Sequence, residues 1–488
     1  MTELKYDSKK DLGLLISDRL EEIREHFSIK NEAAKFIRGY GRFAPQRTYA
    51  ITATGKFDPC LAVEIKKYFI SNQYSDELKV DEDLLNAVKP SRVWQNDARF
   101  TTDIIPLSLS LRDYQEEIVR SAFNTGRGTV VLATAGGKTL TAASLLTKLF
   151  VLKGSKFKCL YVVPDLSLVE QTFSDFASYN VPFSTRKWTG SNPIEQDKIS
   201  PANVIIANLG ILQSKNSDLN WLATIDALIV DEVHKIRRGN EVNKLFKIIK
   251  TPCRFGFTGT MPECPLDQWN IIGKIGPVIY EKTSYQLRLE SYVSNVSVVV
   301  LQINYSKQPQ YPKELINASD RYRTEINFLV KNNFRNNLLT KFSCGTNKNT
   351  LILVDFIEHG EILFNKLSET CNNKQVFFIR GEVEVDEREK VRKLMEEHDN
   401  VVVVAISKIF STGINIKNLH YIIFAGGGKA KVKILQSIGR GLRLHKDKDK
   451  LIIVDIADNL QYGYQHFSKR KALYEKENIT YQIKEVQE

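Results

Sequence analysis

Short apolar runs alternate with longer amphipathic segments over most of this 488-residue chain. From Trp94 onward, runs of strand length that are rich in Val and Ile are separated by segments with helical spacing of apolar residues. The predicted strands are 129–133, 159–163, 204–207, 227–230 and 254–258 in a first series, and 296–303, 350–354, 375–379, 400–405, 421–425 and 451–455 in a second. This alternation predicts an α/β protein with two successive parallel sheets, each covered by helices on both faces.

The residues before Trp94 have a different pattern, in which short helical and short strand-like segments are mixed. Helical spacing of apolar residues predicts helices at 11–27 and 61–69, and the C-terminal segment 469–488 has the composition of a charged helix. The predicted domains are a small N-terminal α+β domain at 1–92, a first α/β unit at 93–288 and a second at 289–488.

Composition narrows the class of protein further. Hydrophobic residues make up 42% of the chain and charged residues 26%, which is ordinary for a globular protein and too apolar for wholesale disorder. No apolar window is long enough for a membrane span, and the polar N-terminus carries no signal peptide pattern. We therefore expect a soluble, cytoplasmic protein without a membrane partner.

The cysteines and the net charge give weaker indications. Six scattered cysteines form no CxxC pair and no spaced His/Cys cluster, so we expect free thiols in a reducing compartment and no structural zinc site. The formal net charge of +12 suggests a polyanionic partner, although a solvated lysine-rich surface would give the same total.

A glycine-rich loop follows the first predicted strand, in the sequence VVLATAGGKT at 130–139. Glycines allow backbone N–H groups to face phosphate oxygens, and the following helix presents its positive dipole end. Lys138 is expected to reach the β- and γ-phosphates of a nucleotide, and the Thr139 hydroxyl to bind Mg²⁺. The strict pattern requires Gly where Leu132 stands, so a glycine turn before an ordinary helix is the alternative. The predicted phosphate-loop residues are Thr134, Ala135, Gly136, Gly137, Lys138 and Thr139.

Two adjacent carboxylates end the predicted strand at 227–230. In P-loop motors this arrangement places a magnesium-binding Asp next to a Glu that activates water. Asp231 is therefore the candidate Mg²⁺ ligand and Glu232 the candidate base. A solvated strand end is the alternative, but the phosphate loop about 90 residues earlier favours the catalytic interpretation.

The second α/β unit contains an arginine-rich segment. Residues 427–450 hold eight basic and two acidic residues, and Gln436, Arg440 and Arg443 are spaced along one predicted helix. Arginines that face a nucleotide stabilise the charge that develops during phosphoryl transfer. The alternative is a basic helix that faces solvent.

Together these three motifs resemble the signature of superfamily 2 helicases of the DExH group. The other motifs of that family follow in order: the glutamine motif at 111–115, motif Ia at 163–171, motif Ib at 207–213, motif III at 257–262, motif IV at 352–356 and motif V at 405–415. The resemblance implies two tandem RecA-like lobes, ATP and Mg²⁺ as cofactors, and a nucleic-acid partner.

The resemblance also implies roles for further residues. Arg112, Gln115 and Gly413 would contact ATP, and His234, Thr258 and Thr260 would couple the nucleotide to the nucleic-acid side. The implied nucleic-acid contacts are Pro164, Gln171, Asn208 and Thr412. Motif II reads Asp-Glu-Val-His with Val233 as its third residue, motif III reads Thr-Gly-Thr, and motif V has Asn415 where Asp is commoner.

A narrower resemblance points to the UvsW-like branch-migration DNA helicases of tailed phages. It rests on FSTGINIKNLH and ILQSIGRGLR in motifs V and VI, and on EEIREHFSI and AVEIKKYF near the N-terminus. It implies a DNA track, forked or junction DNA as substrate in replication, recombination or repair, a monomer, and the host bacterial cytoplasm if the gene is phage-encoded.

The N-terminal segment 35–57 interleaves basic and aromatic residues, as a surface that binds single-stranded DNA requires. Arg38 and Arg42 are its candidate contacts, although aromatic residues of a small domain also form its core. Three alternative functions stay open: a double-strand DNA translocase that separates no strands, an RNA helicase, and a nucleic-acid clamp with an inactive ATPase core. The presence of Lys138, Glu232 and both arginines argues against the clamp.

Overall fold

The computed structural model describes residues 2–31, 46–74, 78–95, 97, 99–101, 103–193, 202–214, 219–236, 243, 245–312, 314, 317–380, 385–407, 416, 418–426 and 450–488. The chain divides into two compact units. The first comprises Met1–Leu132 and Gly137–Lys282, and the second comprises Ala133–Gly136 and Thr283–Glu488.

The first unit begins with a mixed four-stranded sheet in the order β5-β2-β1-β6. Its strands are β1 (Thr2–Asp7), β2 (Leu12–Ile16), β5 (Lys56–Phe57) and β6 (Leu78–Val80), and a separate hairpin joins β3 (Ser28–Lys30) to β4 (Arg47–Tyr49). The helices of this part are α1 (Leu20–His26), α2 (Ala62–Ser71), α3 (Glu82–Val88) and α4 (Ser91–Trp94). A common apolar core, which includes Leu15, Ile23 and Phe69, holds these elements together.

The helix predicted at 61–69 is confirmed as α2, whereas the single helix predicted at 11–27 is wrong. Leu12–Ile16 is strand β2, and only Leu20–His26 is helical. The strand forms because Leu12–Ile16 pairs with Glu3–Asp7 of β1 in antiparallel register, from Leu12 opposite Asp7 to Ile16 opposite Glu3. Pairing with a neighbouring strand thus overrides a helical spacing of apolar residues.

The rest of the first unit contains a seven-stranded, fully parallel sheet in the order β13-β7-β12-β11-β8-β10-β9. Its strands are β7 (Gly128–Leu132), β8 (Cys159–Val163), β9 (Thr185–Trp188), β10 (Val204–Asn208), β11 (Ala227–Asp231), β12 (Arg254–Thr258) and β13 (Val278–Lys282). Every residue of β7, β8, β11 and β12 is buried, as expected for strands that are covered on both faces. All five strands of the first predicted series are therefore confirmed, and β9 and β13 are additional.

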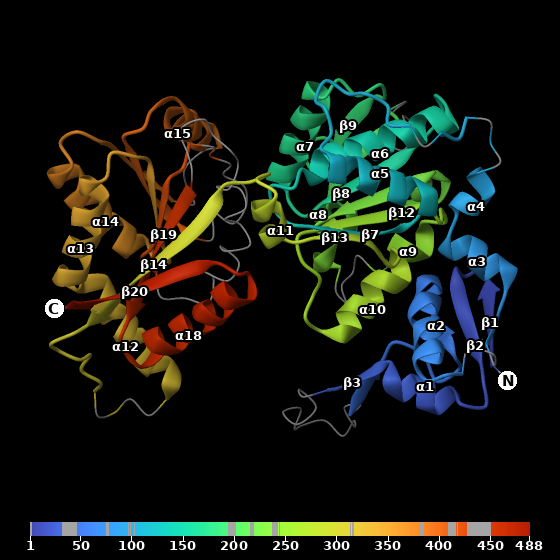
Figure 1. Cartoon of the computed structure of the whole chain (residues 1–488), viewed down its shortest axis with the longest axis horizontal. Helices are drawn as coiled ribbons and strands as arrows, with labels where there is room; N and C mark the ends of the chain where they lie inside the picture. The colour runs from blue at the N-terminus through green and yellow to red at the C-terminus, as the bar shows by residue number, and fades with distance from the viewer. Residues whose placement is uncertain are drawn as a thin grey trace. The chain divides into compact units, whose positions relative to one another are not determined.

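Helices cover both faces of this sheet, with α5, α6 and α7 on one side and α9 and α10 on the other (Figure 1). The helices are α5 (Asp113–Thr125), α6 (Lys138–Lys153), α7 (Leu166–Ser178), α8 (Leu209–Gln213), α9 (Leu245–Ile248) and α10 (Pro265–Lys274). Leu160 and Val162 of β8 share a buried core with Ile271 of α10, so the alternating side chains of the strands fill the space on each side.

The second unit contains another seven-stranded parallel sheet, in the order β16-β17-β15-β18-β19-β14-β20. Its strands are β14 (Asn295–Asn304), β15 (Thr350–Val354), β16 (Gln375–Ile379), β17 (Val401–Ile406), β18 (Tyr421–Phe424), β19 (Lys450–Asp458) and β20 (Thr480–Gln487). All six strands of the second predicted series are confirmed. The charged helix predicted at 469–488 is partly wrong, because its last residues form β20, which pairs with β14.

The helices of the second unit also cover both faces of its sheet. They are α11 (Ser284–Leu289), α12 (Ala318–Lys331), α13 (Asn333–Gly345), α14 (Ile357–Thr370), α15 (Val385–Glu397) and α18 (Gln461–Lys476). In β19, Val454 and Ile456 pack with residues of α12, α13 and α14, whereas Asp455 accepts hydrogen bonds from Arg470 and Tyr474 of α18 (2.8 Å each). Because neighbouring side chains of a strand point to opposite faces, α18 lies across the sheet from those three helices.

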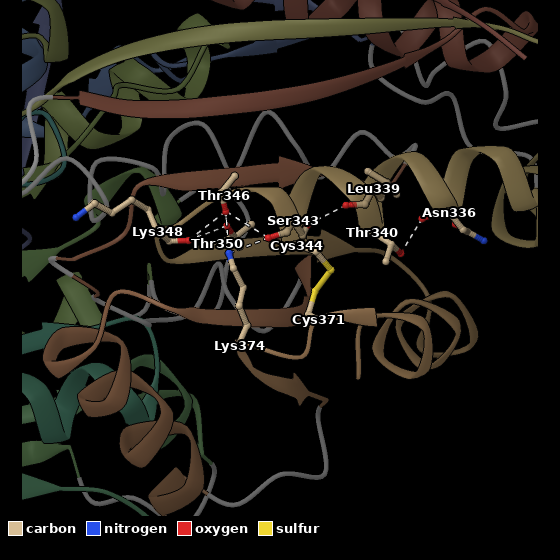
Figure 2. The surroundings of a disulfide bond; sticks show 10 residues. All are labelled: Asn336, Leu339, Thr340, Ser343, Cys344, Thr346, Lys348, Thr350, Cys371 and Lys374. Carbon is tan, nitrogen blue, oxygen red and sulfur yellow. Dashed lines mark hydrogen bonds between the residues drawn. A yellow bond between two sulfur atoms is a disulfide. The ribbon is translucent and has the colours of Figure 1, made fainter. Parts of the chain in front are cut away.

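A disulfide bond joins Cys344 of α13 to Cys371, which follows α14 (Figure 2). The expectation that all six cysteines are free thiols is therefore wrong for this pair, while Cys60, Cys159, Cys253 and Cys264 are free. Sequence spacing gives no sign of the bridge, because 27 residues separate the two sulfurs and the packing of α13 against α14 brings them together.

Candidate functional site

The glycine-rich loop turns sharply between β7 and α6. The Gly136 N–H donates a hydrogen bond to the Ala133 carbonyl oxygen (3.0 Å), and both Ala135 and Gly137 have positive φ angles, of 66° and 81°. Thr134 lies in the same loop, and Lys138 and Thr139 form the first turn of α6. Since Gly137 has no side chain to cap this helix, the N–H groups at its start and its positive dipole end favour a bound anion.

Gln115 links the glutamine motif to this loop. It lies in the first turn of α5, and its Oε1 accepts a hydrogen bond from the Arg112 N–H (2.9 Å). A Cβ at position 137 would collide with the Gln115 side-chain amide, so only glycine allows the two segments to approach this closely. Arg112 and Gln115 therefore lie next to the predicted phosphate loop, as the sequence motif requires.

Three titratable side chains meet at the ends of β7 and β11. Lys138 Nζ lies 3.5 Å from Glu232 Oε1, and His234 Nδ1 lies 3.3 Å from Glu232 Oε2. Asp231, at the end of β11, is 7% exposed, and its Oδ1 accepts the Glu232 N–H (2.8 Å). The structure thus brings together the phosphate-loop lysine and both predicted carboxylates, which lie about 90 residues apart in sequence.

The Glu232 carboxylate is held in an unusual state. Its backbone has φ 50° and ψ 48°, a left-handed conformation that is costly for a residue with a side chain. Burial alone raises the pKa of Glu232, but the Lys138 ammonium and the His234 ring outweigh it, so the pKa lies below its ordinary value of 4.5. Glu232 is therefore ionised, with its negative charge paired to Lys138.

The predicted coupling residues form a continuous chain of hydrogen bonds. His234 Nδ1 and Thr258 Oγ1 lie 2.8 Å apart, and the Thr258 hydroxyl donates to the Thr260 carbonyl oxygen (2.9 Å). Because the hydroxyl proton is used on Thr260, Thr258 accepts from His234, which requires the proton on Nδ1. Motif II and motif III are therefore connected directly, from Glu232 through His234 to Thr260.

The donor set fits a magnesium ion bound together with a nucleotide. Asp231 supplies a carboxylate and Thr139 a hydroxyl, which are the oxygen ligands that Mg²⁺ prefers. Mg²⁺ keeps several waters and is usually held by few protein groups and the substrate phosphates, so two protein ligands suffice. No cluster of three or more His, Cys, Asp or Glu residues that suits a protein-only metal site occurs in the described parts of the chain.

Two of the predicted nucleic-acid contacts of the first lobe, Pro164 and Asn208, share one edge of its sheet. Pro164 follows β8, Gln171 lies in α7, and Asn208 is the last residue of β10. Since β8 and β10 are neighbouring parallel strands, their carboxyl ends place motifs Ia and Ib side by side. Asn208 Oδ1 is buried and accepts no hydrogen bond from the described residues.

A cavity of about 500 Å³ lies beside α7 and was not predicted from the sequence. It is lined by Phe173, Arg186 and Lys187, with Lys187 Nζ 2.8 Å from Glu170 Oε2 and 5.1 Å from the Phe173 ring centroid. The adjacent basic residues Arg186 and Lys187 are the sequence feature that could have indicated this cavity. The apolar pattern does not predict the short strand β9 that carries them.

The remaining predicted site residues lie outside the described residues, so their positions stay predictions. They are Arg38, Arg42, Thr412, Gly413, Gln436, Arg440 and Arg443.

Comparison with known proteins agrees with the order of motifs. A family model described as the res subunit of type III restriction enzymes matches residues 108–263, and the helicase conserved C-terminal domain matches residues 331–445. The ATP-dependent DNA helicase UvsW of Enterobacteria phage T4 is 24% identical over 397 residues, which cover 76% of each chain. The chain is a superfamily 2 helicase. It hydrolyses ATP and acts on nucleic acid, as the sequence motifs predict.

One further sequence relative and one solved structure are also similar to this helicase. The DNA 3'-5' translocase XPB2 of Sulfurisphaera tokodaii is 23% identical over 426 residues, which cover 80% of the helicase and 88% of that protein. Among solved structures, the restriction-modification enzyme LlaBIII bound to DNA has a TM-score of 0.56 and 16% identity, covering 84% of the helicase and 33% of that chain. The expected pair of RecA-like lobes is therefore confirmed. Among the described helices of the helicase, none is long and apolar enough to cross a bilayer.

Proposed function

We propose that this helicase is an ATP-driven motor that unwinds or branch-migrates forked and junction DNA. The single observation that carries the ATPase part is the Lys138–Glu232–His234 cluster at the carboxyl edge of the first parallel sheet. The choice of DNA rests on similarity, since UvsW and XPB2 are both named for action on DNA. Branched substrates in replication, recombination or repair are supported by the sequence resemblance to UvsW-like branch-migration helicases in motifs V and VI and near the N-terminus.

ATP binding would release the catalytic carboxylate from its ion pair. Lys138 neutralises Glu232 in this structure, and the polyphosphate of ATP would compete for the same ammonium group. Once Lys138 turns to the phosphates, Glu232 loses its counter-charge, its pKa rises, and it becomes a better base for the attacking water. Arg440 and Arg443 would stabilise the charge that develops on the phosphate, with Gln436 beside them.

A bound Mg²⁺ would supply charge neutralisation for the phosphate oxygens. Asp231 and Thr139 would hold this ion. Arg112 and Gln115 would recognise the adenine end of the nucleotide, and Gly413 would contact ATP from the second lobe.

The nucleic acid would be held mainly through its phosphates, by Pro164, Gln171 and Asn208 on the first lobe and Thr412 on the second. Phosphate contact explains movement that does not depend on sequence. The basic cavity beside α7 extends this surface. In the N-terminal domain, Arg38 and Arg42 would contact single-stranded DNA or the fork.

The proposed domain division is 1–92, 93–288 and 289–488, with the two larger parts as the motor lobes. We further propose that the helicase acts as a monomer in the cytoplasm, which is that of a bacterial host if the gene belongs to a phage. The domain bounds rest on the changes of pattern along the sequence, and the host compartment rests on the resemblance to UvsW-like phage helicases.

The decisive experiment measures ATP turnover and strand displacement on a panel of substrates: forks, Holliday junctions, blunt DNA duplex and RNA duplex. We expect DNA-stimulated turnover, with strand displacement strongest on forks and junctions. Equal activity on RNA and DNA would contradict the DNA assignment.

A double-strand DNA translocase is the second candidate, because XPB2 carries that name and the match covers most of its length. A translocase would hydrolyse ATP on blunt duplex and displace a bound protein from it without separating strands.

A further inference from the structure

Two buried arginine side chains converge on the C-terminal end of α10. Arg127, just before β7, and Arg254, the first residue of β12, are each 1% exposed. Arg127 donates hydrogen bonds to the carbonyl oxygens of Ile275 and Lys274 (2.6 Å each), and Arg254 donates to the Lys274 carbonyl oxygen (3.1 Å). Buried charges are tolerated only when they are paired, so two guanidinium groups at this place require an anion.

The N-terminal domain supplies that anion. Asp11, in the turn between β1 and β2, accepts a hydrogen bond from Arg254 (2.7 Å) and another from the Tyr6 hydroxyl (2.9 Å). Burial raises the pKa of Asp11, but the two arginines lower it below its ordinary value, so the group is a carboxylate. Arg127 also donates to the Ala87 carbonyl oxygen at the end of α3 (3.1 Å).

The same domain also packs against the side of α10 that carries Trp269, Gly273 and Lys274. Lys274 Nζ forms an ion pair with Asp58, and the Phe27 and Trp269 rings meet edge-to-face with centroids 5.2 Å apart. Gly273 allows this contact, because a Cβ there would lie 2.6 Å from the Asp58 Cβ. Helix α10 is therefore packed and ion-paired against the N-terminal domain along its last turns.

Two side chains of α10 also bind the segments that follow the catalytic motifs. Asn270 Nδ2 donates to the Ile236 carbonyl oxygen (3.2 Å), two residues after His234 of motif II. Gln268 Nε2 donates to the Pro262 carbonyl oxygen (2.7 Å), at the end of motif III. Strand β12, motif III and α10 thus form one continuous segment, which the N-terminal domain contacts at its first residue and at its last turn.

We propose that the N-terminal domain positions motif III for the ATPase cycle, with Asp11 as the positioning residue. This inference rests on the proposed ATPase function for its activity readout. Asp11 fixes the start of β12 through Arg254, and Asp58 fixes α10 through Lys274. The hydrogen bond between Thr258 and His234, which joins motif III to motif II, depends on that placement.

The experiment uses the full-length chain with Asp11→Asn. Asparagine tolerates the positive φ of 51° at this position, so the substitution removes the charge and keeps the turn. We expect the maximal rate of DNA-stimulated ATP turnover to fall by about tenfold, as displacement of a catalytic group by a fraction of an ångström produces, with the KM for ATP nearly unchanged. We also expect faster amide hydrogen exchange in Arg254–Thr258 and the motif III residues that follow.

Two further variants complete the design. Asp58→Asn changes a partly exposed carboxylate and folds even if Asp11→Asn does not, and we expect the same effects, but smaller. Asp7→Asn is the matched control: it removes a surface ion pair with Lys10 (3.5 Å), and the asparagine Oδ1 can still accept the Lys10 N–H (3.2 Å). We therefore expect exchange and turnover at wild-type levels.

The exchange measurement tests the inference independently of the turnover. Unchanged exchange in motif III, in folded Asp11→Asn and Asp58→Asn, would overturn the positioning role whatever the turnover. Absence of DNA-stimulated turnover in the wild type would instead contradict the proposed function and leave the exchange result valid. A variant could also lose stability but keep the wild-type maximal rate at temperatures well below its unfolding midpoint. That result would show that the ion pair is purely structural, and it would also overturn the positioning role.

Discussion

In the proposed mechanism the chemistry depends on Glu232, and this residue is held in a costly conformation. Its left-handed backbone costs roughly 1–3 kcal/mol, which the surrounding sheet must offset. In this conformation the Glu232 carboxylate lies next to Lys138 and His234 at the sheet edge. In the proposed mechanism the carboxylate paired with Lys138 is a weak base, so it does not activate water until ATP draws Lys138 away.

Substitutions of this pair separate binding from chemistry. We expect Glu232→Gln to bind ATP but to lower the rate of turnover by about 10²–10⁴-fold, the range for loss of a general base. Lys138→Ala should weaken ATP binding as well, because it removes the charge that meets the phosphates. Nucleotide binding by fluorescence titration and steady-state turnover measure the two effects.

Glu64→Gln is the control for these variants, since Glu64 belongs to an exposed surface pair with Lys67 on α2. It should leave both binding and turnover unchanged. Turnover that survives Glu232→Gln would show that another group activates the water.

Asp11 predicts a specific pH dependence of stability. Its folded-state pKa lies below the ordinary value of 3.8, so the unfolded chain binds a proton before the folded protein does. The stability from Asp11 is therefore complete above about pH 4 and is lost as the pH falls through the folded-state value. We expect Asp11→Asn to lower the free energy of unfolding by about 3–5 kcal/mol at neutral pH, and the difference from wild type to shrink in acid.

Denaturant unfolding of the wild type and Asp11→Asn over a pH series measures this difference. The assignment would be contradicted if the difference in unfolding free energy between wild type and Asp11→Asn disappeared at alkaline pH, where a tyrosine hydroxyl loses its proton. The hydrogen bond from the Tyr6 hydroxyl, and not the Arg254 ion pair, would then account for the difference.

At the scale of elements, the parallel strands could be predicted and several other elements could not. Buried strands such as Cys159–Val163 and Val401–Ile406 read as continuous apolar runs, because both faces are covered. Leu12, Leu15 and Ile16 of strand β2 also fit helical spacing, so the sequence predicts a helix there. Only pairing with β1 decides between helix and strand. Strand β20 was missed because its side chains are largely exposed and show no apolar run.

The candidate site was predictable for a related reason. Phosphate binding and carboxylate chemistry depend on residues that are adjacent in sequence, such as Gly137–Lys138 and Asp231–Glu232. The contact between Gln115 and Gly137, the strained backbone of Glu232 and the pairing of Asp11 with Arg254 depend on distances between remote segments. No pattern along the chain encodes those distances.

The disulfide between α13 and α14 predicts a redox-dependent stability of the second unit. Closing a loop of 27 residues restricts the unfolded chain and contributes about 3–4 kcal/mol in the chain-entropy estimate. We expect Cys344→Ser to lower the free energy of unfolding by up to that amount under oxidising conditions and to have little effect in the presence of reductant. Denaturant unfolding with and without dithiothreitol measures it.

Cys264→Ser is the matched control, because Cys264 is a free thiol. We expect its effect on the free energy of unfolding to be the same with and without reductant. An equal loss of stability for Cys344→Ser with reductant present would show that packing of the sulfur, and not the bond, is responsible.

At the scale of the whole molecule, the net charge of +12 gains meaning from its distribution. Residues 427–450 alone carry a net charge of +6, yet the proposed mechanism directs Arg440 and Arg443 to ATP. The charge available for the nucleic acid is therefore smaller than the total suggests. We expect it to include Arg186 at the cavity beside α7, where Lys187 is already paired with Glu170.

This division of charge predicts different salt dependences for the two ligands. Phosphate contacts release counterions, so affinity for DNA should fall linearly on a logarithmic plot against salt, by roughly 10³–10⁵-fold between about 50 and 200 mM for six to ten contacts. Turnover at saturating DNA should change far less, because Lys138 and Glu232 act at short range in a largely buried site where screening is weak. Titrating DNA against ATP turnover at several salt concentrations gives both quantities. A DNA affinity that hardly responds to salt would mean that stacking on aromatic side chains, and not phosphate contact, holds the strand, and would contradict sequence-independent tracking along the backbone.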